Sequence, residues 1–185
     1  MASKINLISN ALILIGDLPI TSLTGNTRAQ TVANNLYDNI VHNELTKYRW
    51  GFARKKAQLS KINETPVGTE YDVMYQLPSD LLVFIKMNPS INYQILGDRV
   101  YCNYDTNLFC DYIYTVSEAT WPAYFSKMVE YALAKDFAMS IRDSASTKQL
   151  MNEEYINASN MARYTDSQQH PITPLTSRPF VDVRF

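Results

Sequence analysis

Residues 50–62 read Trp-Gly-Phe-Ala-Arg-Lys-Lys-Ala-Gln-Leu-Ser-Lys-Ile, and the spacing of apolar side chains changes within this stretch. Upstream of it, apolar residues recur every three or four positions, which is typical of helices that bury one face. Inside the stretch, apolar and polar residues alternate loosely, which indicates an extended strand. Its apolar members are Trp50, Phe52, Ala57, Leu59 and Ile62. The chain is therefore expected to change from helix to β structure at Trp50.

Two helices are predicted upstream. Ser3 can cap a first helix that runs to about Ile15, and Gly16 then provides a C-terminal cap. A second helix is predicted from about Thr27 to Tyr48. Its expected apolar stripe consists of Val32, Leu36, Ile40, Val41, Leu45 and Tyr48. Its opposite face carries Asn and Asp side chains, which predicts a solvated or interface-forming surface.

A β region is predicted over about residues 50–117. Residues 71–77 and 81–87 are short apolar runs typical of strands. Residues 92–103 are expected to form a hairpin, with Gly97-Asp98 as its two-residue turn. Residues 109–116 add another strand that is rich in Tyr and Ile. Short strands joined by tight turns favour antiparallel pairing.

Helical spacing returns at about residue 120, with Pro122 in the first turn, where its missing N–H costs nothing. The expected apolar stripe of this helix is Phe125, Met128, Val129, Ala132, Leu133, Phe137 and Ile141. A last helix is predicted over about 146–164, with an apolar face of Leu150, Met151, Tyr155, Ala158, Met161 and Ala162. The predicted fold class is α+β. Helices over about 3–48 and 120–164 are expected to form one bundle, with an antiparallel β region of about residues 50–117 between them in the sequence, and both belong to one domain of residues 1–165.

Residues 166–185 differ in composition from the rest of the chain. Pro171, Pro174 and Pro179 exclude helix and favour extended or polyproline II backbone. The segment continues with apolar residues that alternate with Asp182 and Arg184, as in a strand that pairs with a partner's edge. These apolar residues are Phe180, Val181, Val183 and Phe185. We predict an extended tail that docks on another protein or a neighbouring copy; a mobile C-terminus is the alternative.

The bulk composition is that of one globular domain. The chain has 185 residues, 46% of them hydrophobic, and a net charge of -1, so no global field attracts nucleic acid or an anionic membrane. Its 13 Tyr residues suit a surface that a partner covers. The start is not typical of a signal peptide, and no apolar run approaches the length of a membrane span. We therefore expect synthesis in the cytosol and no membrane partner.

No catalytic, metal-binding or cofactor-binding residue is predicted. His42 and His170 are the only histidines, and neither has a ligand at metal-site spacing. The 5 glycines are too scattered for a phosphate loop, and no nucleophile elbow is present. Glu153, Glu154 and Asp136 are the candidate acid–base carboxylates, for which a solvated helix face is the simpler interpretation. Cys102 and Cys110 are expected to be buried free thiols, although a disulfide between facing strands stays open.

One basic cluster surrounds Trp50 and Phe52. Its members are Lys47, Arg49, Arg54, Lys55, Lys56 and Lys61. Basic residues beside aromatic rings are typical of modules that bind single-stranded nucleic acid. A strand with a solvated basic face is the simpler interpretation. A third is that these side chains face an acidic neighbouring subunit or a channel through which DNA passes.

Several motifs occur along the chain in a characteristic order. They are Leu-Ile-Gly-Asp-Leu-Pro-Ile-Thr-Ser-Leu at 14–23, Ala-Asn-Asn-Leu-Tyr-Asp at 33–38, Trp-Gly-Phe-Ala-Arg-Lys-Lys-Ala-Gln-Leu at 50–59, Tyr-Gln-Leu-Pro-Ser-Asp at 75–80 and Tyr-Ile-Tyr-Thr-Val at 112–116, followed by Trp121. In this order, the set resembles the tail tubular protein A family, the head–tail adaptors of short-tailed phages. The resemblance covers nearly the whole chain.

The resemblance implies a structural virion protein without catalytic activity or a cofactor. Members form a ring of identical subunits, usually dodecameric, between the portal protein and the tail nozzle protein at the head–tail junction of the virion. The ring carries the DNA channel for genome packaging, retention and ejection, without sequence-specific DNA binding. In related adaptors the C-terminal segment reaches the portal, which would be the role of residues 166–185 here.

Overall fold

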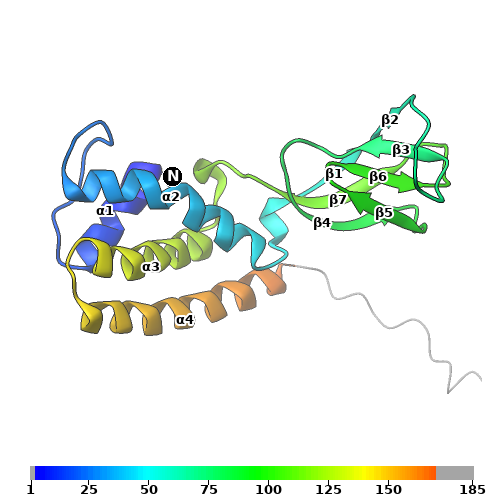
Figure 1. The fold of residues 1–185 in the computed structure, drawn as a ribbon. Coiled ribbons are helices and arrows are strands. Elements are labelled where there is room, and N and C mark those ends of the chain that lie inside the picture. Colours follow the sequence, from blue (N-terminus) through cyan, green and yellow to red (C-terminus); the bar gives the residue numbers. More distant parts are fainter. Residues whose placement is uncertain (1–2, 170–185) are drawn as a thin grey trace, which may run out of the picture.

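The computed structural model describes residues 3–169 and has an α+β fold, with about 47% helix and 20% strand. Helices gather at one end and two antiparallel sheets at the other (Figure 1). The chain crosses between the two ends after the second helix and again before the third. The predicted α+β class is confirmed: the N- and C-terminal helices form one bundle, and the antiparallel β region lies between them in the sequence.

Four α-helices make the bundle. They are α1 (Lys4–Leu14), α2 (Arg28–Thr46), α3 (Ala123–Ser140) and α4 (Ala145–Gln168). Ser3 caps α1 by accepting a hydrogen bond from the Asn6 backbone N–H, as the sequence predicts. Thr27 and Gln30 form a reciprocal capping box at the start of α2. These caps fix where the first two helices begin.

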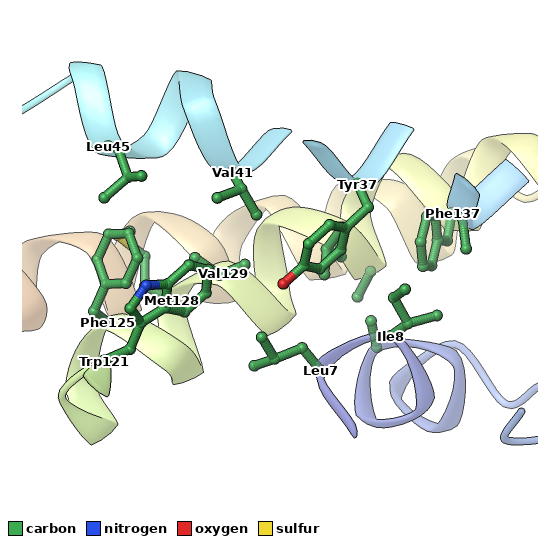
Figure 2. Close-up of a cluster of buried hydrophobic side chains, with 14 of the residues drawn as sticks. Leu7, Ile8, Tyr37, Val41, Leu45, Trp121, Phe125, Met128, Val129 and Phe137 are labelled. Atoms are coloured by element: carbon green, nitrogen blue, oxygen red, sulfur yellow. The ribbon is translucent and has the colours of Figure 1, made fainter. Parts of the chain in front are cut away.

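The bundle core lies around α3, which packs against the other three helices. Its predicted stripe, including Phe125 and Phe137, is fully buried except for half-buried Ile141. Figure 2 shows these side chains meeting Leu7 and Ile8 of α1 and residues of α2. Apolar burial in this core supplies the main favourable contribution to folding of the bundle.

Seven strands make the two sheets. The three-stranded sheet has the order β1 (Arg54–Gln58), β7 (Phe109–Tyr114), β4 (Leu81–Asn88). The four-stranded sheet has the order β2 (Ser60–Ile62), β3 (Val73–Gln76), β6 (Arg99–Cys102), β5 (Tyr93–Leu96). Leu96 pairs with Arg99, which confirms the hairpin and its Gly97-Asp98 turn. Gly97 has φ +62°, a conformation that glycine adopts without strain.

A second, smaller core lies between the sheets. It contains Val100, Leu108 and the two cysteines. Cys102 and Cys110 are both buried and both free, as the sequence favours. Burial raises the pKa of the Cys110 thiol to about 11, so this group stays protonated near neutral pH. The thiols therefore act as small apolar side chains in the core.

The strand prediction at Trp50 and Phe52 is wrong. Gly51–Ala53 form a 3-10 turn, and β1 begins only at Arg54. The Trp50 ring is buried in the bundle core, with its centroid 5.0 Å from that of Phe125, and Phe52 lies 4.8 Å from the same ring. Burial of these large apolar surfaces outweighs the local alternation of polar and apolar residues.

Two helix faces also differ from prediction. In α2, Ala33 and Tyr37 are fully buried, whereas part of the predicted stripe is only half-buried. In α4, the predicted core residues Leu150 and Met161 are 54% and 63% exposed. The bundle covers only one narrow side of α4. The apolar stripe predicted from the spacing of residues is therefore wider than the set of α4 residues that is buried.

Helix α4 extends to Gln168, beyond the predicted boundary at residue 165. Asp166, in this added turn, is fully buried where the bundle meets the sheets. Residues 170–185 lie outside the described part of the chain. None of the helices in residues 3–169 is long and apolar enough to cross a bilayer.

Candidate functional site

The basic segment 47–61 lies along the passage from the bundle to the sheets. Lys47 follows α2, Lys55 lies on β1, and Lys61 lies on β2. All six predicted basic residues are exposed. They do not form one continuous surface, because alternation along β1 directs Arg54 and Lys56 to one face of the sheet and Lys55 to the other.

Asp111 is the centre of the largest group of these cations. It lies on the middle strand, β7, and is 4% exposed. Arg54 donates a 2.7 Å hydrogen bond to Asp111 Oδ2, and the Nζ atoms of Lys56 and Lys86 lie 3.7 and 3.9 Å from the carboxylate oxygens. Burial by itself raises the pKa of Asp111. The Arg54 hydrogen bond and the three positive charges together outweigh that effect, so the pKa lies below its ordinary value.

The cations and the carboxylate of this group come from all three strands of the sheet. Lys56 on β1 and Lys86 on β4 both pair in register with Asp111 on β7. Three cations surround a single carboxylate, so this face keeps an excess of positive charge. Asp111 Oδ1 has no hydrogen-bond donor among residues 3–169. We call Arg54, Lys56, Lys86 and Asp111 the cationic face.

Lys55 belongs to a separate group on the other side of β1. Its Nζ atom lies 2.8 Å from Asp80 Oδ2, and the Tyr112 hydroxyl donates a 2.8 Å hydrogen bond to Asp80 Oδ1. The Lys55 hydrogen bond lowers the pKa of Asp80, against an opposing effect of burial. Lys55 also lies 5.2 Å from the centre of the Tyr114 ring. The group holds β1, β7 and the turn before β4 together.

The remaining basic residues of the segment are dispersed. Lys61 pairs with Asp105 at the edge of the sheets. Lys47 donates hydrogen bonds to buried Glu44 and to the Tyr155 hydroxyl on α4. Arg49 is exposed and forms no ion pair with a described residue. Most of the predicted basic cluster therefore serves to connect parts of this chain.

The aromatic residues of the segment are largely covered, because Trp50 is buried and Tyr48 and Phe52 are half-buried. Trp50 is 1% exposed, and its indole N–H donates a 2.9 Å hydrogen bond to the Glu44 carbonyl. Phe52 packs against Phe125 and Tyr124 in the same core. Base stacking requires an accessible ring face. Trp50 therefore cannot serve as the stacking platform that the sequence suggests, and Phe52 is half-covered.

Asp166 is a structural residue that the sequence prediction missed. Its carboxylate accepts hydrogen bonds from the Gly51 backbone N–H at 3.0 Å and from the Tyr124 hydroxyl at 2.8 Å. It therefore joins α4, α3 and the turn that leads into β1. A carboxylate that is buried and hydrogen-bonded in this way fixes the angle at which the chain leaves the bundle. No spacing motif in the sequence marks it.

The other candidates lie apart from one another. His42 is exposed on α2, Glu153 is exposed on α4, and Asp136 is half-buried on α3. Among residues 3–169, no group of three or more His, Cys, Asp or Glu side chains is placed to hold a metal ion. The predicted docking residues lie outside the described part. These are Pro171, Pro174, Pro179, Phe180, Val181, Val183 and Phe185.

A groove of about 610 Å³ lies where the loop after α1 meets the start of α2 and the end of α3. Its walls include Leu18, Pro19 and Ile141, with Arg28 and Arg142 at its margin. The Arg28 guanidinium donates a hydrogen bond to the Ser140 carbonyl, so it ties α2 to the end of α3.

No family model matches the chain, and no curated protein sequence matches it closely enough to indicate a relative. The resemblance to head–tail adaptors accordingly rests on the order of motifs in the sequence.

Proposed function

We propose that this chain is a non-enzymatic structural virion protein, a head-to-tail adaptor whose copies form a ring between a portal and a tail nozzle. The observation that carries the proposal is the joint between the bundle and the sheets. Trp50, Phe52 and Phe125 pack there, and Asp166 ties three segments together. A subunit that links two larger assemblies needs such a fixed angle between its two ends.

The distribution of polar groups also supports an assembly role. The buried carboxylates Glu44, Asp111 and Asp166 bond to groups of the same chain, which is a structural use. The exposed apolar residues of α4 provide a surface that a partner can cover, since Met161 and Tyr164 are 63% and 61% exposed. In the proposed ring, the tail of residues 170–185 contacts the portal or an adjacent subunit.

The proposal is tested by removing the tail and measuring binding to portal complexes of the same virus. The deletion should begin at residue 170, because removal of Asp166 would disrupt the joint. We expect loss of co-sedimentation with portal complexes while circular dichroism and thermal unfolding stay unchanged. A matched variant, Leu18→Ser, changes an 81% exposed residue of the bundle and should bind normally. Failure of the full-length chain to bind portal complexes would refute the proposal.

A nucleic-acid-binding module based on segment 47–61 is the alternative, and it has less support. Trp50 is buried and Phe52 is half-buried against the core, and most of the cations pair with acids of the same chain. Filter binding with single-stranded DNA decides between the two. Salt-sensitive binding that is lost in Lys55→Glu and Lys56→Glu would favour the module over the adaptor.

A further inference from the structure

Opposite charges are separated on the β part of the molecule. The cationic face lies on the three-stranded sheet. Acidic residues gather on the loop of residues 63–72, which joins β2 to β3. β1 and β2 lead away from the bundle, so this loop lies at the end of the molecule that is remote from the helices (Figure 1). The two features therefore lie on different elements of one copy.

The loop 63–72 carries Glu64, Glu70 and Asp72, and the chain has no Lys or Arg between Lys61 and Lys86. All three acids are exposed. Only Glu64 forms an ion pair within residues 3–169, at 3.7 Å from Arg99. We call residues 63–72 the acidic loop. Its charge is mostly uncompensated within one copy.

The tip of the acidic loop has an apolar side chain that nothing covers. Val67 is 92% exposed and precedes Gly68, whose φ of +78° turns the chain back toward β3. An exposed apolar residue flanked by acids is typical of the centre and rim of a small contact surface. The cationic face offers the complementary charge. The cationic face and the acidic loop thus fit a contact between two copies of this chain.

We propose that the acidic loop of one copy docks on the cationic face of the next, in a head-to-tail contact. This inference rests on the proposed function, since it names the surface through which ring subunits would meet. The contact is heterologous, because different surfaces of the two copies meet. Repetition of such a contact closes into a ring when the rotation between copies allows it.

A second copy fits the cationic face better than a nucleic acid does. A polyanion would be attracted to the cationic face but repelled by the acidic loop of the same subunit. The net charge of -1 provides no general attraction for it either. A second copy uses both features at once, and it also covers Val67. Charge complementarity therefore favours self-association.

The test is a charge-exchange experiment with two variants. The face variant carries Lys56→Glu and Lys86→Glu, and the loop variant carries Glu70→Lys and Asp72→Lys. Analytical ultracentrifugation at low ionic strength measures the association constant. We expect wild-type self-association that weakens with added salt, and a loss of about tenfold or more in each variant alone.

Mixing restores the attraction if the two surfaces meet. An equimolar mixture of face and loop variants pairs each reversed surface with its opposite, so association should return toward the wild-type value. The four-substitution variant should likewise associate with itself. A control with Arg142→Glu and Lys148→Glu reverses two exposed cations on the bundle and should behave as wild type. Circular dichroism checks folding, and milder Lys56→Gln and Lys86→Gln substitutions should weaken association without adding acids beside Asp111.

Three outcomes would overturn the inference. One is a wild-type chain that stays monomeric at low salt. Another is a pair of variants whose mixture associates no better than either alone. The third is DNA binding that the face variant loses and the loop variant keeps, which would assign the cationic face to a polyanion. Binding of the full-length chain to portal complexes is measured separately, so the proposed function can stand or fail independently of this contact.

Discussion

The helical bundle and the β part are held together by different interactions. The bundle buries large side chains such as Trp50 and Phe125, whose exposures are near zero. The β part has a smaller core, and its outer faces carry exposed ion pairs such as Lys55–Asp80 and Lys61–Asp105. Apolar burial stabilises by several kcal/mol per large residue, whereas exposed ion pairs contribute about 0–1 kcal/mol. Stability should therefore be concentrated in the bundle and the joint.

The difference suggests a division of work between the two ends. A tightly packed bundle provides a rigid base, and its joint with the sheets fixes where they point. The charged faces of the sheets contribute less to folding, so they can carry charges that suit a partner. Comparing variants across the two parts can confirm or break this interpretation.

The largest effect is expected for Trp50→Ala. It removes a ring that is 1% exposed and leaves a cavity beside Phe125. The free energy of unfolding should fall by about 3–5 kcal/mol, as measured by urea denaturation. The exposed control Tyr164→Ala, on α4, should change it by less than about 0.5 kcal/mol. Equal effects of the two variants would contradict a core at the joint.

Asp166→Ala should have the next largest effect. It leaves the Gly51 N–H and the Tyr124 hydroxyl without their acceptor in a buried setting. We expect a loss of about 2–3 kcal/mol in the free energy of unfolding. Glu153→Ala, an exposed acid on the same helix, is the matched control and should be nearly neutral. If the two variants lose the same amount, Asp166 does not hold the joint.

Asp111→Asn tests the cationic face and should cost about 1–2 kcal/mol near neutral pH. Because the folded-state pKa of Asp111 is depressed, its contribution is present above the unfolded pKa of about 4 and is lost as pH falls through the folded pKa. Wild type and variant should therefore converge in stability below about pH 4. Denaturation curves between pH 7 and 3 measure this. A constant difference over that range would show that the carboxylate charge is not the cause.

The smallest effect is expected for Lys55→Ala. Its ion pair with Asp80 joins side chains that are 47% and 37% exposed, and Asp80 keeps its hydrogen bond from Tyr112. The change in the free energy of unfolding should be the smallest of the four and should shrink further in added salt. A loss comparable to that of Trp50→Ala would contradict the expectation that stability is concentrated in the bundle and the joint.

The individual helices and hairpins could largely be predicted from the sequence. Ser3 and the alternation around Gly97 mark a helix start and a hairpin, because caps and tight turns depend on a few neighbouring residues. Periodicity likewise identified the buried stripe of α3. The fold class followed from the order of these elements. The assignment as an adaptor remains a proposal.

Only the tertiary structure determined which partners the side chains meet. Arg54 and Asp111 are 57 positions apart, and Gly51 and Asp166 are 115 apart, so no spacing rule connects them. Trp50 reads as part of a strand locally but enters the bundle core, because packing against Phe125 removes more apolar surface from water. Periodicity reports which face of an element is apolar, whereas the neighbouring elements decide how much of it is covered. For this reason, the basic residues that are close together in the sequence are divided in the structure between separate ion pairs and the cationic face.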